Sequence, residues 1–239
     1  IAGSTVVGYL VSGFGTDMIV YTAIAGILAA LFLVMRNPNP MPVSVSEEDQ
    51  IRPPLLALLT EAPVLKFIIL VSLIQGSHAA YYSFSSIYWK ESGYQESTIG
   101  YLWSLGVIAE VMVFAFSKRL FSGWKVSTLF KVTAAGVMVR WGLTAATTEL
   151  FALVLVQALH GVTFAMAHLA AIQYIQRFPQ NKMIPLQALY NAIPLGAFIA
   201  LMTTLSGWGY EAWGANIFWL MAAMGSFALL IKLDKVTDK

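Results

Sequence analysis

Residues 97–117 read STIGYLWSLGVIAEVMVFAFS, an apolar run of membrane-helix length whose one charged side chain is Glu110. A helix rises about 1.5 Å per residue, so such a run reaches across the roughly 30 Å hydrocarbon core of a bilayer. Similar runs occur before and after it along the chain. We therefore predict an all-helical integral membrane protein.

The composition supports the same fold class. Charged residues make up 11% of the chain and apolar residues 58%, whereas soluble domains carry about 25% charged residues. A soluble fold could not cover its surface with so few charges, but lipid accepts an apolar exterior. The lack of cysteine excludes disulfides, thiolate metal sites and thiol redox chemistry, and a net charge of +2 gives no footprint for nucleic acid.

The spacing of the apolar runs predicts about eight transmembrane segments. The first run is too short to span a bilayer and begins at Ile1 without a preceding charged stretch, so we expect a truncated helix that follows earlier ones, and no signal peptide. The runs lie at 1–14, 18–35, 65–89, 97–117, 126–147, 150–175, 185–207 and 212–233.

Residues 37–63 differ in character from the apolar runs. They hold six of the nine prolines and the acidic cluster Glu47–Asp49, a pattern typical of a polar linker. The predicted domains are therefore the last two helices of an N-terminal bundle at 1–36, a linker at 37–63, and a six-helix bundle with a short tail at 64–239.

The basic residues predict the orientation of these segments. If the linker is cytoplasmic, 12 of the 14 Lys and Arg residues lie on that side, Lys90 lies on the other, and Arg140 lies within a span. Cytoplasmic loops of membrane proteins carry such an excess of Lys and Arg. We therefore expect the linker and the C-terminus to face the cytoplasm.

A few polar side chains fall where lipid disfavours them. The spans contain one carboxylate, Glu110, and one guanidinium, Arg140, and a charge near the bilayer centre costs at least about 2.5–3.5 kcal/mol. His78 and His160 lie near the same depth, so we expect these four groups to line one aqueous cavity. Two simpler interpretations are a structural Glu110–Arg140 ion pair and a purely interhelical hydrogen bond at His160. His168 lies nearer the cytoplasmic end, where a structural role is expected.

Other polar and aromatic residues of the spans are candidates for substrate contact. Amide side chains in membrane helices also join helices to one another, which is their alternative role. Pro194 lies near the middle of its span, where we expect a kink. The complete set of substrate-binding candidates is His78, Tyr81, Tyr82, Arg140, Gln157, Gln187 and Asn191.

Several of these residues stand in motifs that resemble a known family. Two helices, a linker and six helices resemble the later two-thirds of a twelve-helix transporter of the major facilitator superfamily. More closely, the motifs resemble the bacterial 3-phenylpropionate transporters of that superfamily. The matching stretches are Gln75–Tyr82 (QGSHAAYY), Ile87–Trp89 (IYW), Gly100–Val107 (GYLWSLGV) with Ala109 and Glu110, Val139–Gly142 (VRWG), His160 with Thr163 and Phe164, and His168–Ala171 (HLAA).

A wider likeness concerns proton coupling. Lactose permease-type proton symporters place a Glu, an Arg and a His on three successive C-terminal helices, and Glu110, Arg140 and His160 resemble that set. The permease pattern also has a carboxylate one helical turn after the His, where this chain has Thr163. The resemblance therefore implies proton coupling at Glu110, Arg140 and His160, with Glu110 as one possible proton carrier. A residue outside the sequence, or a different coupling scheme, stays open.

These patterns predict a proton symporter that works by alternating access on a small organic solute, such as an aromatic carboxylate. A sugar or nucleoside symporter is the alternative, and an intramembrane enzyme is a weaker one, because no nucleophile elbow, HExxH motif or cysteine occurs. We expect no cofactor or metal, with the proton gradient as energy source. The expected partners are substrate, protons and lipid of a bacterial inner membrane, and the expected functional unit is a monomer of the full-length chain.

Overall fold

The computed structural model describes residues 6–7, 10, 13–15, 17–36 and 52–234, and every regular element within them is helical. The chain divides into two compact units, residues 1–46 and 47–239. In the first unit, α2 (Met18–Arg36) coincides with the second predicted segment and buries none of its residues. The first predicted segment lies partly, and residues 37–51 of the predicted linker wholly, outside the described residues.

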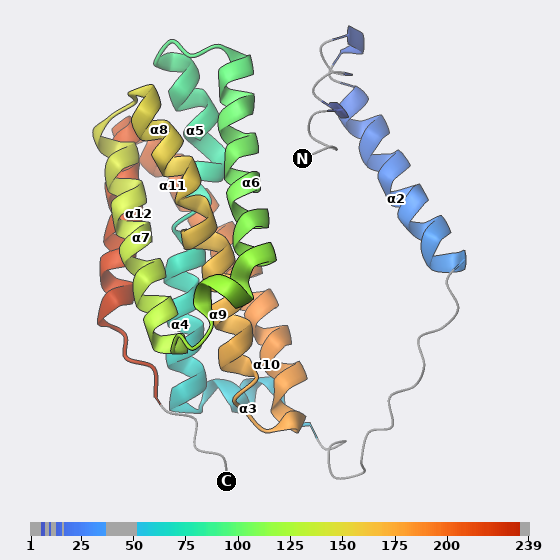
Figure 1. Ribbon diagram of the computed structural model, residues 1–239, viewed down its shortest axis with the longest axis vertical. Coiled ribbons are helices and arrows are strands. Elements are labelled where there is room, and N and C mark those ends of the chain that lie inside the picture. The colour runs from blue at the N-terminus through green and yellow to red at the C-terminus, as the bar shows by residue number, and fades with distance from the viewer. Residues whose placement is uncertain (1–5, 8–9, 11–12, 16, 37–51, 235–239) are drawn as a thin grey trace. The chain divides into compact units, whose positions relative to one another are not determined.

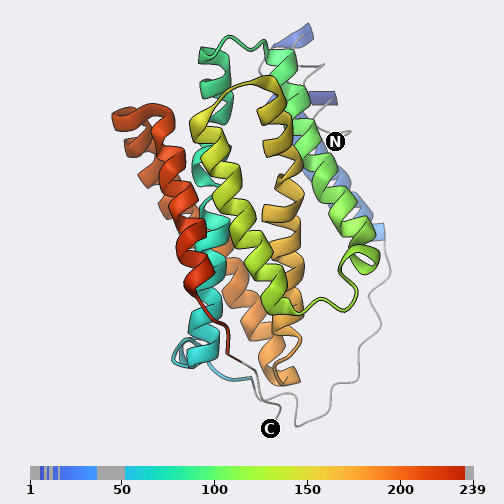
Figure 2. The same cartoon turned by 60° about the vertical axis from the view of Figure 1, so that its left-hand side comes forward.

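The second unit is a bundle of long helical passes, shown from two sides in Figures 1 and 2. A short helix, α3 (Leu55–Leu59), lies within the end of the predicted linker and precedes the bundle. The passes are α4 (Ala62–Gly76) with α5 (Ala79–Glu91), α6 (Glu96–Phe121), α7 (Val126–Ala146), α8 (Leu150–Ala158) with η2 (Gly161–Ala165) and α9 (Met166–Ile175), α10 (Gln180–Ala192) with η3 (Ile193–Phe198) and α11 (Ile199–Trp213), and α12 (Ile217–Leu230).

Length and hydropathy fit a membrane location for these passes. Within the described residues, five helical stretches are long and apolar enough to cross a bilayer. The longest contains both the α10–α11 pass and α12, while α7, which carries Lys131 and Arg140, is not among the five. The stretches are Met18–Arg36, Ala62–Glu91, Glu96–Phe121, Leu150–Ile175 and Gln180–Leu230.

Three passes are interrupted near their middles: between α4 and α5, at the π-helical turn η2, and at the π-helical turn η3. Between α4 and α5, the Ser77 hydroxyl donates to the Ile74 carbonyl at 2.6 Å, and His78 Nδ1 lies 3.1 Å from the same oxygen, so side chains bond the carbonyl at the break. Between α10 and α11 the chain forms the π-helical turn η3 at Pro194, whose missing N–H interrupts the α-helical ladder. The sequence predicted a kink at this position.

One predicted boundary is wrong. The sequence placed a break at 207–212, but α11 continues to Trp213 and the turn falls at Gly214–Asn216. Gly214 supplies the turn with a φ of +56°, which L side chains rarely adopt. Gly209 instead makes room between helices, because a Cβ there would lie 2.3 Å from Ile217 Cδ1.

Ion pairs close one end of the bundle. Lys66 on α4 bonds Asp234 after α12 at 2.8 Å, and Lys182 on α10 bonds Glu61 before α4 at 2.7 Å. These contacts join the first pass to the two passes that are last in sequence. They lie at the end that the basic residues predict to be cytoplasmic.

Candidate functional site

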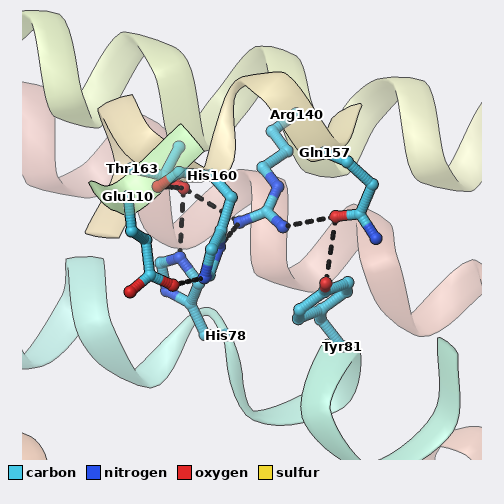
Figure 3. Close-up of polar contacts among 7 residues, drawn as sticks. All are labelled: His78, Tyr81, Glu110, Arg140, Gln157, His160 and Thr163. Carbon is cyan, nitrogen blue, oxygen red and sulfur yellow. Dashed lines mark hydrogen bonds and ion pairs between the residues drawn. The ribbon is translucent and has the colours of Figure 1, made fainter. Parts of the chain in front are cut away.

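The polar centre of the bundle is the Arg140 side chain on α7, which is completely buried. Its Nη1 atom donates to His160 Nδ1 at 2.6 Å and to Thr163 Oγ1 at 2.9 Å. Its Nη2 atom donates to Gln157 Oε1 at 3.3 Å, an oxygen that also accepts from the Tyr81 hydroxyl at 2.9 Å. Neutral groups therefore accept all these bonds, and none of these partners cancels the charge of the guanidinium (Figure 3).

The nearest anion reaches Arg140 through a histidine ring. His160 Nε2 lies 2.5 Å from Oε1 of Glu110 on α6, while the opposite ring nitrogen accepts from Arg140 (Figure 3). A neutral imidazole has one N–H and one acceptor nitrogen. Because Nδ1 accepts from a guanidinium that can only donate, Nε2 must carry the proton and donate it to Glu110. Among the described residues Glu110 pairs with His160 and not directly with Arg140, so the simpler interpretation of a Glu110–Arg140 ion pair is not what the structure has.

Thr163 links a second histidine to the same guanidinium. His78 Nδ1 faces the carbonyl oxygen of Ile74 and therefore carries the proton, which leaves Nε2 as an acceptor. That Nε2 lies 3.1 Å from Thr163 Oγ1, so the hydroxyl donates to His78 and accepts from Arg140. The Thr163 hydroxyl thus joins the His78 ring to the Arg140 guanidinium through two hydrogen bonds.

Aromatic rings enclose the cluster. The Arg140 guanidinium carbon lies 4.6 Å from the ring centre of Tyr81 and 4.3 Å from that of Trp141, distances at which a cation is attracted to a ring. Tyr82 stacks on Trp103 with an interplanar angle of 21°, and its ring centre lies 6.4 Å from that of His160. Tyr82 is 40% exposed, so this stack forms an accessible edge of the site.

The backbone near Gly161 brings Glu110 and His160 together. A Cβ on Gly161 would lie 2.7 Å from the carbonyl oxygen of Ala109, so glycine allows α6 and η2 to approach closely directly beside Glu110. The π-helical turn η2 begins immediately after His160 and carries Thr163. Isolated π-helical turns within α-helices are frequent at functional sites.

The structure brings most of the predicted site residues together. Glu110, Arg140, His160, His78, Tyr81 and Gln157 form one bonded group, and Tyr82 packs against it. The sequence predicted a shared aqueous cavity, but the four central groups contact one another directly or through Thr163. His78, Arg140 and His160 are buried, and only Glu110 among them keeps a substantial part, 22%, of its side chain exposed.

Two candidates lie outside this group. Gln187 and Asn191 are exposed on α10, and neither takes part in its hydrogen bonds. His168, whose Nδ1 lies 2.7 Å from the Tyr190 hydroxyl, also belongs to a separate contact.

Sequence reasoning noted Thr163 only as a departure from a pattern, and it missed Trp141 as a cover for the guanidinium. A hydroxyl three residues after a buried histidine was the available signal for Thr163.

The site also contains two buried donors without a partner. Within the described residues, Arg140 Nε and Gln157 Nε2 are buried and make no hydrogen bond. A buried donor without an acceptor is costly. The cluster therefore has two buried donors that no acceptor in the described part of the chain satisfies.

Comparison with known proteins agrees with this architecture. The model of the MFS_1 like family matches residues 1–221, most of the chain. The chain belongs to this family. The family assignment confirms the predicted major facilitator superfamily fold, of which these residues form a part, and makes the chain a multi-pass membrane protein of a transporter family.

The chain is also similar to a named bacterial protein. The chain is 39% identical over 234 residues to a protein of Escherichia coli (strain K12) named "Probable 3-phenylpropionic acid transporter", and the alignment covers 97% of the chain. It covers 61% of the relative, so the chain spans about three-fifths of that protein's length. No solved structure matches the chain with significance. The resemblance to phenylpropionate transporters that the motifs indicated is thus confirmed.

Proposed function

We propose that this chain forms part of a proton-coupled symporter, in a bacterial inner membrane, for a small aromatic carboxylate. The proposed transport is by alternating access, in which two helix bundles rock about a central site. The observation that carries the proposal is the chain of contacts from buried Arg140 through His160 to partly exposed Glu110. It combines, in a membrane bundle, a fixed cation with a carboxylate that can take a proton.

The chemistry of the site supports proton coupling and an aromatic carboxylate as the substrate. Burial disfavours the ionised form of a carboxyl group, and a nearby cation favours it, so a conformational change that alters their separation changes proton affinity. The stacked rings of Tyr82 and Trp103 offer a surface for an aromatic ring. The name of the Escherichia coli relative supports a phenylpropionate-like substrate.

Uptake by the full-length protein in membrane vesicles tests the proposal. The substrates are labelled 3-phenylpropionate, other aromatic acids, sugars and nucleosides, each with and without an inwardly directed proton gradient. We expect accumulation of an aromatic acid against its own gradient, and loss of accumulation when an ionophore dissipates the pH difference. Gradient-driven uptake of a sugar or nucleoside without any aromatic acid would overturn the proposed substrate, and uptake indifferent to the pH gradient would overturn proton coupling.

A further inference from the structure

The charge balance of the buried cluster suggests how proton and substrate are linked. Among the groups that contact one another there, Arg140 is the fixed cation and Glu110 the carboxylate. With Glu110 ionised and both histidines neutral, as the hydrogen bonds require, the cluster is neutral. One added anion would leave an excess negative charge among buried groups, which a low-dielectric environment strongly disfavours.

We propose that the carboxylate of the substrate and the ionised carboxylate of Glu110 are mutually exclusive partners of His160. Protonation of Glu110 forms its O–H bond and removes its charge, which frees the Nε2–H of His160 to donate to the incoming carboxylate. The cluster then again holds one cation and one anion, so its net charge is the same before and after. The inference rests on the proposed function and specifies its coupling step.

The exposed edge of the cluster fits this exchange. Of the three residues Glu110, His160 and Arg140, Glu110 has the most exposed side chain, whereas Arg140 lies behind His160 and has no exposed surface. A ligand carboxylate that arrives at this edge therefore meets the Glu110–His160 bond before it meets the guanidinium. The structure thus favours replacement at His160 over direct capture by Arg140.

The aromatic stack lies at a suitable distance from His160. The ring centre of Tyr82 is 6.4 Å from that of His160. In an extended 3-phenylpropionate, with carbon–carbon bonds of about 1.5 Å, the carboxyl carbon lies roughly 5 Å from the ring centre and the carboxylate oxygens roughly 6 Å. The two lengths are of similar size, so a ligand ring packed beside the Tyr82–Trp103 pair has the reach to bring its carboxylate to His160. An aromatic monocarboxylate with a two-carbon spacer is the ligand that this geometry favours.

Other titratable and charged groups near Glu110 must be separated from its effect. Between about pH 6 and pH 8.5, the Arg140 guanidinium stays charged and the tyrosines stay neutral. The three histidines are therefore the other groups whose titration affects binding in this range. These groups come from each element packed near Glu110: Tyr81, Tyr82 and His78 at α5, Arg140 on α7, and His160 and His168 on the α8–α9 pass.

Binding of two matched ligands to the full-length protein tests the proposal. The ligands are 3-phenylpropionate and its neutral amide, 3-phenylpropanamide, titrated into purified protein between about pH 6 and pH 8.5. The free ligand acid resembles a glutamate side chain, with a pKa of about 4.3, so it stays ionised throughout. We expect its affinity to fall by up to tenfold per pH unit over the range in which Glu110 loses its proton, because one proton is linked to one ligand. The amide should show no such loss.

Two variants assign this dependence to Glu110. In Glu110→Gln, the affinity for 3-phenylpropionate should become independent of pH and stay at the level of the wild type at low pH. Glu96→Gln is the matched control, since Glu96 pairs with Lys90 at an exposed end of α6, and it should keep the wild-type dependence. Equal pH dependence for acid and amide, or an unchanged dependence in Glu110→Gln, would overturn the proposal.

A measurement on the wild type keeps the test independent of variant folding. Calorimetry in buffers of different ionisation enthalpy counts the protons taken up on binding. The count should approach one per 3-phenylpropionate at a pH where the affinity falls, and zero for the amide. Equal counts for the two ligands would contradict the exchange and leave the proposed function standing. If the wild type binds no aromatic acid at any pH, the proposed function itself fails, and the exchange fails with it.

Discussion

Arg140 and His160 are joined by a 2.6 Å hydrogen bond from Nη1 to Nδ1, and this bond fixes the proton of the imidazole on Nε2. The fixed tautomer makes His160 a donor to Glu110, so a neutral ring connects the buried cation with the carboxylate. A direct ion pair would hold Glu110 against Arg140, whereas the bridged arrangement leaves Glu110 at an exposed edge.

Replacement of Glu110 should uncouple transport from the proton gradient. Glutamine keeps the shape of the side chain and most of its hydrogen bonding but cannot titrate. In vesicles that contain the full-length Glu110→Gln protein, we expect uptake to reach only the level seen without a pH gradient, while exchange of labelled for unlabelled substrate survives in part. Immunodetection of the protein in the membrane provides the necessary comparison.

A purely structural role for Glu110 predicts a different outcome. Loss of the anion would then leave a buried cation uncompensated, at a cost of about 3–5 kcal/mol, and the amount of protein in the membrane should collapse. Normal abundance together with intact uphill uptake would refute the coupling role. Glu96→Gln, at an exposed position of the same helix, should alter neither quantity.

Transport should be electroneutral if one proton enters with one carboxylate. With a fixed pH gradient, a potential imposed by potassium and valinomycin should change the initial rate of 3-phenylpropionate uptake little. A pH gradient alone, at zero potential, should be sufficient to drive accumulation. Strong stimulation by an inside-negative potential would show that additional positive charge enters and would contradict this stoichiometry.

Removal of the Thr163 hydroxyl should destabilise the bundle. In Thr163→Val, Arg140 loses an acceptor and His78 loses a donor within a buried region. Leaving a buried polar group unpaired costs about 1–3 kcal/mol, so we expect a lower midpoint of thermal unfolding in detergent. Thr163→Ser retains the hydroxyl and should recover most of the difference. Equal midpoints for the Val and Ser variants would show that these bonds contribute little.

A methyl group at Gly161 should separate α6 from the π-helical turn. The Cβ in Gly161→Ala would meet the carbonyl oxygen of Ala109 at 2.7 Å, and overpacking of this kind typically costs about 1–3 kcal/mol. We expect lower thermal stability and weaker binding of 3-phenylpropionate, because Glu110 and His160 are displaced. Gly100→Ala is the matched change on α6, where nothing lies within 4 Å of the added carbon, and it should leave binding unchanged.

Loss of the Tyr82 ring should weaken the binding of aromatic ligands selectively. An aromatic contact is worth about 0.5–1.5 kcal/mol beyond area burial, so Tyr82→Leu should reduce affinity for 3-phenylpropionate by roughly 2- to 13-fold. The same change should have little effect on an aliphatic acid of similar length, and Tyr82→Phe should retain near-normal affinity. Equal losses for aromatic and aliphatic acids would indicate that Tyr82 acts by shaping the site and not by stacking.

The amino-acid sequence was sufficient to predict the fold class and the ionisable residues of the site. Runs of apolar residues and the scarcity of charge depend on local composition, so they predict membrane helices without knowledge of packing. Glu110, Arg140 and His160 were identifiable because an ionisable group is costly within lipid wherever its helix lies. The end of α11 was missed, because the glycines at 207 and 209 are typical of a turn, and only the packing of Gly209 against Ile217 explains their place in a helix.

Which polar groups form hydrogen bonds and which lie apart depends on how the helices pack. Gln157 and Gln187 have the same side chain in similar spans, yet the rotation of each helix places the first against Arg140 and leaves the second exposed. The contact between Gly161 and Ala109 brings Glu110 within reach of His160, and the π-helical turn places Thr163 between Arg140 and His78. Hydropathy depends on residue type alone, whereas helix rotation, register and the direction of each hydrogen bond depend on all the helices packed around them.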